Sequence, residues 1–292
     1  HWWIHWNCKF VKTNKQNIQQ VRVFKKNNII TIEVVYLYNE KELKLNNDRY
    51  CSIDLGINNL ATVSSNVIKP FIINGKPIKS INQFYNKKLA YYKSKLKNRK
   101  TSKKINRLTN KRENKIKDYL HKSSRYIVNH LVSNNINTLV IGYNKGWKQD
   151  INIGKVNNQK FVNVPFLTFI TMLEYKCKIE GINVIINEES YTSKCSFLDD
   201  EEICKHDNYL GRRIKRGLFK TSNGIFMNAD LNGSLNILKK VVGKFSYPIE
   251  VCSMPVVITT KLNWISLKFI RLSNYICNIK INSYEKVCSI LQ

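Results

Sequence analysis

Two aspartates stand in segments whose other side chains are built for burial. Asp54 lies in the apolar strand pattern CSIDLGINNLAT, and Asp230 opens the amphipathic helix pattern NADLNGSLNILKK. A buried charge is costly unless it is paired. The chain carries 49 Lys and Arg against 20 Asp and Glu, a formal net charge of +29. In so basic a chain we expect these two carboxylates to face a divalent cation.

The composition predicts a soluble protein that binds a polyanion. The 292 residues are 43% hydrophobic, which is enough for a core in one large domain or two smaller ones. A pI near 9.8 favours nucleic acid as the partner. No apolar run approaches the roughly 18 residues of a spanning helix, and no signal peptide is seen. We therefore expect no membrane partner and an intracellular location, in the cytoplasm or nucleoid, or in the nucleus of a eukaryotic host. The sequence carries no signal for an oligomeric state.

The order of the periodic segments predicts an α/β fold. A hairpin over 20–38 precedes a three-stranded meander, two basic helices lie within 79–125, and a strand, helix and parallel strand follow. The last helix begins at Asp230. The predicted segments of the second half are strand 137–141, helix 165–180, strand 182–187 and helix 230–242. After Gly243 the tail has no clear period, and packed strands or read-through after a frameshift explain it equally well.

Five motifs, taken together, resemble the TnpB (OrfB) family. The motifs are DLGINNLAT, VIGYNKGWKQ, EESYTSKCSFLD, GRRIKRG and NADLNGSLNIL. This family comprises transposon-encoded, RNA-guided DNA nucleases, long described as transposases, with eukaryotic relatives called Fanzors. The resemblance covers about residues 20–243. It implies a ribonuclease-H-like (RuvC-like) mixed sheet with flanking helices, preceded by a β-barrel remnant.

The resemblance also implies a division into domains. Residues 1–48 would be the remnant of an N-terminal β-barrel whose earlier part is missing, which indicates a truncated copy. The nuclease domain would cover 49–243, with a basic helical insertion at 79–135 and a degenerate zinc-ribbon or basic loop at 192–227. Residues 244–292 would form an irregular tail.

The predicted catalytic and metal-binding residues are Asp54, Glu189 and Asp230, which the resemblance assigns to two Mg²⁺ ions. Each aspartate taken alone also fits a turn or a helix cap. Most relatives place the middle Glu where this chain has Gly142, so we expect Glu189, on the next strand, to replace it, as in the Fanzor-like branch. Neighbouring strands lie about 4.8 Å apart, which a Glu side chain can span. Glu188 is the alternative ligand, and two solvated acids in an inactive copy are the alternative reading.

Many relatives hold zinc with four cysteines, but here Cys195 and Cys204 are accompanied only by His206. This spacing is too wide and incomplete for a four-ligand site, so we expect no structural zinc, with a decayed three-ligand site as the alternative. His121 and His130 are expected to be packing residues. The nucleic-acid surface is predicted from basic residues in three segments: Lys97, Arg99, Lys100, Lys103, Lys104, Arg107, Lys145, Lys148, Arg212, Arg213, Lys215 and Arg216.

The predicted function is a transposon-associated, magnesium-dependent, RNA-guided DNA endonuclease that cleaves phosphodiesters by two-metal hydrolysis. DNA and a guide RNA are the expected partners. One alternative is a catalytically inactive remnant that only binds DNA or RNA. Another is a basic structural protein, such as a ribosomal component, which would need no carboxylate cluster.

Overall fold

The computed structural model describes residues 4–6, 9–11, 13–26, 29–38, 40–43, 46–96, 100–144, 164–245, 247, 255–260 and 275–277. Contacts divide the chain into two compact units. One unit comprises 1–40, 98–110 and 263–292, and the other comprises 41–97 and 111–262.

The unit with the N-terminus is built on the predicted hairpin, which is confirmed. Strands β3 (Ile18–Lys26) and β4 (Ile29–Tyr36) are antiparallel, and β14 (Tyr275–Cys277) pairs in parallel with β4. Two short strands, β1 (Ile4–Trp6) and β2 (Lys9–Val11), form a separate antiparallel pair. The described strands form open sheets of three and two strands, so the β-barrel remnant stays a prediction.

Six of the described strands form one mixed sheet in the second unit, in the order β13-β7-β6-β5-β8-β9. The predicted meander is β5 (Tyr50–Leu55), β6 (Asn59–Ser65) and β7 (Phe71–Asn74), all antiparallel. Strands β8 (Thr138–Gly142) and β9 (Asn183–Asn187) run parallel to each other, as predicted. Strand β8 also pairs in parallel with β5. Strand β13 (Val256–Ile258), within the segment predicted as a tail, adds in parallel to β7. The α/β class with a mixed sheet is therefore confirmed.

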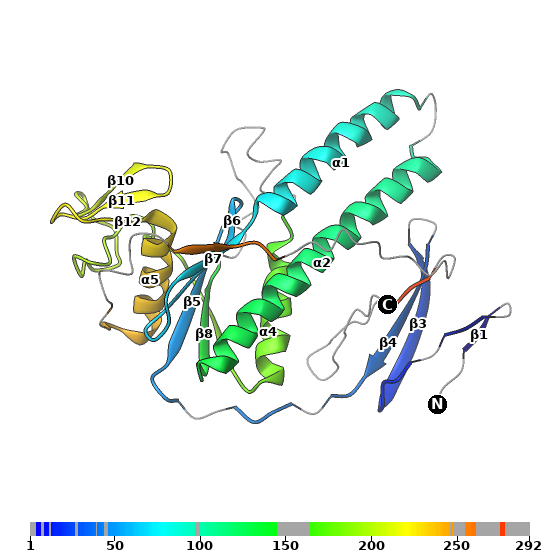
Figure 1. Ribbon diagram of the computed structural model, residues 1–292, viewed down its shortest axis with the longest axis horizontal. Helices are drawn as coiled ribbons and strands as arrows, with labels where there is room; N and C mark the ends of the chain where they lie inside the picture. The colour runs from blue at the N-terminus through cyan, green and yellow to red at the C-terminus, as the bar shows by residue number, and fades with distance from the viewer. Residues whose placement is uncertain are drawn as a thin grey trace. The chain divides into compact units, whose positions relative to one another are not determined.

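The helices divide between the two faces of this sheet (Figure 1). Helices α2 (Lys103–Ser133) and α4 (Phe166–Ile179) lie on one side, and α5 (Ala229–Val242) lies on the other. Gly181, with a φ of +71°, ends the α4 segment in the left-handed conformation that glycine adopts readily. Helix α1 (Lys76–Ser94) precedes α2. None of the described helices combines the length and the apolar character needed to cross a membrane.

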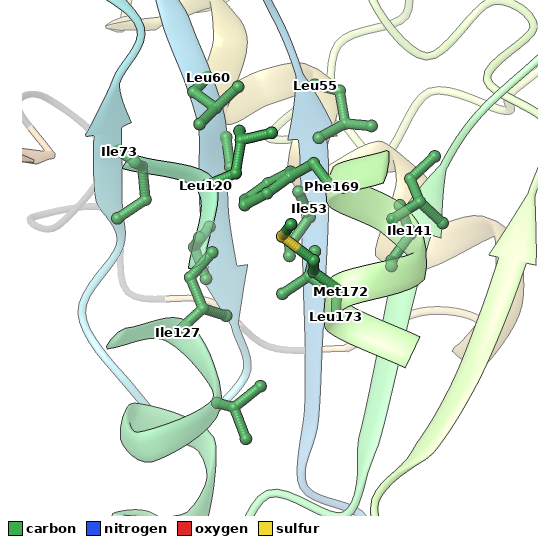
Figure 2. Close-up of a cluster of buried hydrophobic side chains, with 14 of the residues drawn as sticks. Ile53, Leu55, Leu60, Ile73, Leu120, Ile127, Ile141, Phe169, Met172 and Leu173 are labelled. Atoms are coloured by element: carbon green, nitrogen blue, oxygen red, sulfur yellow. The ribbon is translucent and has the colours of Figure 1, made fainter. Parts of the chain in front are cut away.

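The main core fills the space between the sheet and helices α2 and α4 (Figure 2). Ile53 from β5 and Ile141 from β8 meet Phe169 and Leu173 from α4, and α2 contributes Leu120. The buried residues of β5 on this face are odd-numbered, as the two-residue period of a strand requires. The even-numbered side chains of β5 face α5, and Asp54 is one of them.

Candidate active site

Small residues bring α5 close to the centre of the sheet. The hydroxyls of Ser52 and Ser64 lie 2.8 Å apart, and Ser64 lies 2.8 Å from the hydroxyl of Ser234. Ser52 also donates to the Ser234 carbonyl at 2.7 Å. A Cβ built on Gly233 would lie 3.0 Å from Oδ2 of Asp54. The second turn of α5 therefore lies directly against the Asp54 carboxylate.

Asp54 is placed where several negative charges meet. It pairs with Thr62 across β5 and β6, near the end of β5. Burial, followed by the charges of Glu189 and Asp230, raises the pKa of Asp54 well above its usual value. The guanidinium of Arg213 lowers this pKa, but it does not cancel the increase. The structure thus brings the three predicted acids within electrostatic reach of one another.

Glu189 is held at both ends of its backbone. Its N–H donates to Oδ1 of Asn144 at 2.8 Å, and its carbonyl accepts from the Thr192 hydroxyl at 2.8 Å. Its side-chain Oε1 is buried and has no hydrogen-bond partner among the described residues. Burial raises the pKa of Glu189 to about 7. A buried carboxylate oxygen without a hydrogen-bond partner can act as a ligand for a cation.

Gly142 makes room for this side chain. A Cβ at position 142 would lie 2.6 Å from Oε1 of Glu189, 2.8 Å from its Cγ and 2.5 Å from Cδ1 of Ile237. The Glu189 side chain therefore crosses the end of β8, where the resemblance led us to expect a compensating carboxylate. Glu188 is exposed and accepts a hydrogen bond from the Ser190 hydroxyl. Of the two candidates, Glu189 is the one beside Asp54.

Asp230 lies in the first turn of α5. The side chain of Asn228 caps this helix by accepting from the N–H groups of Asp230 and Leu231, each at 3.0 Å. The Asp230 carboxylate accepts from Nδ2 of Asn59 at 2.6 Å and from Nη2 of Arg213 at 3.3 Å. A negative charge at this position is also favoured by the helix dipole.

The acids do not form a finished ion cage. Within the described ranges, no three His, Cys, Asp or Glu side chains meet closely enough to hold a metal ion. The Asp230 carboxylate accepts hydrogen bonds from Asn59 and Arg213. What the geometry offers is an enclosed pair, Asp54 and Glu189, with Asp230 alongside and neutralised.

The roles of four residues that set this geometry were not predicted from the sequence. Asn59 is five residues after Asp54, across the β5–β6 turn, so hairpin geometry was the available signal. Asn144 stands two residues after Gly142 in the VIGYN motif. Arg213 was predicted only as a nucleic-acid ligand, and the steric role of Gly142 had no sequence signal.

Two family models match this chain, and together they span the site. A model described as a probable transposase (OrfB, IS605) matches residues 33–148, which include Asp54 and Gly142. A model described as the Cas12f1-like TNB domain matches residues 166–237, which include Glu189 and Asp230. These matches support a relationship between the chain and the TnpB (OrfB) family.

Relatives within and around this family share 28% identity with the chain. One is the CRISPR-associated endodeoxyribonuclease Cas12f2 of a Micrarchaeota archaeon, aligned over 208 residues, 65% of this chain and 36% of that protein. Another is the TnpB-like protein MJ0751 of Methanocaldococcus jannaschii, aligned over 197 residues, 63% of this chain and 65% of that protein. The chain thus spans about a third and just under two thirds of these curated relatives.

A solved structure supports the fold assignment. The cryo-EM structure of a CRISPR-Cas12f ternary complex aligns with a TM-score of 0.50 at 16% identity, covering 70% of this chain and 41% of that one. At this identity the likeness concerns the fold alone.

The segment between β9 and α5 is held by hydrogen bonds to α5 and to a buried acid. It contains an antiparallel sheet of β10 (Arg212–Lys215), β11 (Leu218–Lys220) and β12 (Phe226–Asn228). From α5, Nδ2 of Asn232 donates to the Cys195 carbonyl at 2.8 Å, and Nδ2 of Asn236 donates to the same carbonyl at 2.8 Å. Buried Glu201 accepts from the N–H groups of Ser196 and Leu210. These bonds fix the loop that follows Glu189.

The three residues weighed as a zinc remnant lie close together in this insertion. Sγ of Cys204 is 3.3 Å from Nε2 of His206, and Sγ of Cys195 is 3.6 Å from the Cys204 carbonyl. In the part of the chain that is described they form no metal-holding group. The expectation that the protein holds no structural zinc stays a prediction.

The predicted basic surface is only partly described. Lys100, Lys103, Lys104 and Arg107 are exposed in one unit, and Arg212, Lys215 and Arg216 are exposed around β10 in the other. Arg213 is also exposed, but it is paired with Asp230. Lys97, Arg99, Lys145 and Lys148 lie outside the described residues.

Proposed function

We propose that this chain is the nuclease portion of a transposon-associated, RNA-guided DNA endonuclease that hydrolyses phosphodiesters with Mg²⁺. The observation that carries the proposal is the enclosed pair of Asp54 and Glu189, whose pKa values are both raised. Buried like charges cost stability, and structures retain them where a function needs them. The similarity to the two family models supports the same reaction class.

The donor set fits Mg²⁺. Glu189 presents a buried oxygen without a partner, and Asp54 is repelled by both neighbouring acids. A divalent cation would relieve both strains, and carboxylate oxygens are the ligands that Mg²⁺ prefers. Asp54, Glu189 and Asp230 would hold two ions. When bound, such ions lower the pKa of a water molecule and stabilise the leaving oxygen of the phosphodiester.

The remaining residues of the site position these acids. Asn144 and Thr192 fix the backbone of Glu189, and Gly142 leaves space for its side chain. Asn59 orients the Asp230 carboxylate by donating to Oδ2. Arg213 neutralises the same carboxylate from the β10–β11 hairpin. Asp230 would contribute to the ligand set the carboxylate that Asn59 and Arg213 contact.

The proposed partners are DNA and a guide RNA. A net charge of +29 offers many contacts to phosphates, which provide affinity without reading sequence. In RNA-guided recognition the base pairing supplies the sequence choice and the protein reads backbone charge and shape. The relative named an endodeoxyribonuclease supports DNA as the cleaved strand.

The proposal is tested by cleavage of single-stranded DNA by the purified chain, with Mg²⁺ or with EDTA. Asp54→Asn and Glu189→Gln should each reduce the Mg²⁺-dependent rate by about 100-fold or more, because each removes a ligand charge. The matched control is Glu188→Gln, adjacent in sequence but exposed, which should keep the rate within about threefold. Loss of activity only in the control would move the ligand to Glu188.

A second candidate function is nucleic-acid binding without catalysis. Two observations favour it: Asp230 is paired with Asn59 and Arg213, and no metal-holding group of three side chains is found among the described residues. If the wild type and the Asp54, Glu189 and Glu188 variants all show the same residual cleavage but still bind nucleic acid, the chain is a binding protein and the nuclease proposal fails.

A further inference from the structure

Helix α1 carries an exposed face that the proposed active site does not use. Phe84 and Tyr91 are 59% and 51% exposed, although large aromatic side chains normally seek burial. They are seven residues apart, which places them on the same face of the helix. Lys88 and Lys95 complete this face at the intervening and following turns, and both are exposed. We call Phe84, Lys88, Tyr91 and Lys95 the aromatic face of α1.

The opposite side of α1 is the one that packs within the unit. Ile78 and Asn82 are buried there, and Oδ1 of Asn82 accepts from Nε of Arg112 at 2.7 Å. The Arg112 guanidinium also lies over the ring of Tyr85, 4.9 Å from its centroid. The exposure of Phe84 and Tyr91 is therefore not needed to attach α1 to α2.

The charge around these rings is of one sign. From Lys76 to Lys95 the chain has six lysines and no Asp or Glu. The ammonium of Lys95 lies over the Tyr91 ring, 4.5 Å from its centroid. This pairs an exposed ring with a cation that can reach a phosphate beside it. Protein–protein interfaces are depleted of lysine, whereas every charged side chain of α1 is a lysine.

We propose that the aromatic face of α1 binds unpaired bases of a single-stranded RNA or DNA segment. Phe84 and Tyr91 stack on bases, and Lys88 and Lys95 contact the adjoining phosphates. Stacking is tolerant of sequence because every base has a π-face, and it requires a strand whose bases are not already paired. The rings are about 10 Å apart along the axis, at a rise of 1.5 Å per residue, so they hold bases that are not immediate neighbours.

The inference rests on the proposed function only in taking nucleic acid as the ligand. Its test measures binding in EDTA, so that cleavage plays no part. Fluorescence anisotropy compares a 12-nucleotide DNA strand, the same strand as RNA, and the 12-base-pair DNA duplex. Phe84→Ala/Tyr91→Ala should weaken binding to single strands by about tenfold or more and to the duplex by less than about twofold. Phe84→Trp/Tyr91→Trp should restore it.

Two further variants separate stacking from charge and from folding. Lys88→Ala/Lys95→Ala should lower the affinity for the DNA strand, the RNA strand and the duplex alike, and it should reduce the salt dependence of binding. Leu167→Ala removes an equally exposed apolar side chain from α4 and should change nothing. A loss confined to RNA assigns the face to a guide, and one confined to DNA assigns it to a substrate strand.

Four outcomes overturn the inference. If Phe84→Ala/Tyr91→Ala loses as much affinity for the duplex as for the single strands, the effect is one of charge or folding. If its affinity for the single strands is unchanged, the two rings do not contribute to binding. Concentration-dependent self-association that the alanine variant abolishes would assign the face to a second copy. If the wild-type chain binds no nucleic acid at all, the proposed function fails together with this inference, whereas the other outcomes leave the nuclease proposal intact.

Discussion

The two faces of the central sheet are built from the same strands but obey different rules. On β5, Cys51 and Ile53 enter the apolar core under α2 and α4, whereas Ser52 and Asp54 face α5. The apolar face is stabilised by removing surface from water. The α5 face contains hydroxyls, amides and carboxylates, each of which needs a partner. The comparison teaches that one strand can supply both the stability and the chemistry of a domain.

Polar satisfaction on the α5 face is uneven. The serines satisfy one another, and Asn232 and Asn236 of α5 bind backbone groups of the insertion. Glu189 differs from these residues, because its buried Oε1 has no hydrogen-bond partner within the described part of the chain. The site therefore costs stability that the apolar face must offset, as is common for functional sites.

The largest expected effect lies on the apolar face. Phe169→Ala should lower the free energy of unfolding by about 3–5 kcal/mol, because Phe169 is fully buried and its removal leaves a cavity. Urea unfolding measures the change. Leu167→Ala on the same helix is exposed and should change stability by no more than about 0.5 kcal/mol. Equal costs for both would mean that this face does not carry the core.

His121 should make the α2–α4 side less stable in acid. Burial, followed by the charges of Lys176, Lys117 and Arg125, lowers its pKa from 6.5 to about 4. The unfolded chain therefore binds a proton at higher pH than the folded chain, and stability falls as the pH drops from about 6.5 to 4. The loss is at most about 3 kcal/mol. The free energy of unfolding of His121→Gln should fall less between pH 7 and pH 4 than that of the wild type. An equal fall in both proteins would show that His121 is not the titrating group.

Glu189, on the α5 face, should give stability the opposite dependence on pH. Its pKa is raised from 4.5 to about 7, so the folded chain keeps a proton that the unfolded chain has lost. Stability should thus fall as the pH rises from about 4.5 to 7, again by at most about 3 kcal/mol. Glu189→Gln should remove this loss, and Glu188→Gln should retain it. Under the proposed function Mg²⁺ should also reduce the loss in the wild type, as thermal unfolding with and without the ion would show.

The smallest expected effect tests whether Gly142 and Glu189 are coupled. Gly142→Ala should cost about 1–3 kcal/mol, because the added methyl overlaps Glu189 and Ile237. In a double-mutant cycle with Glu189→Ala, the pair should cost less than the sum, since one clash is gone. Strict additivity would show that the glutamate does not occupy the space above Gly142.

The α5 face was also the harder one to predict. The strands and helices were predictable, because periods of 2 and 3.6 are local properties of a sequence. Asp54 and Asp230 stood out because each interrupts such a period. Glu189 could be favoured over Glu188 only through the resemblance, since two adjacent acids after a strand look alike in sequence. The partners of Asp230 were not predictable, because Asn59 and Arg213 come from separate hairpins.

Three properties could be predicted without coordinates: the order and kind of the elements, the excess of positive charge and the acids that interrupt apolar patterns. Each of these depends on residues that are neighbours along the chain. Only the tertiary structure decided that Glu189 crosses Gly142, that Arg213 neutralises Asp230 and that Phe84 and Tyr91 stay exposed. These facts depend on distances between segments far apart in the sequence, which are set when α5 and the insertion pack against the sheet.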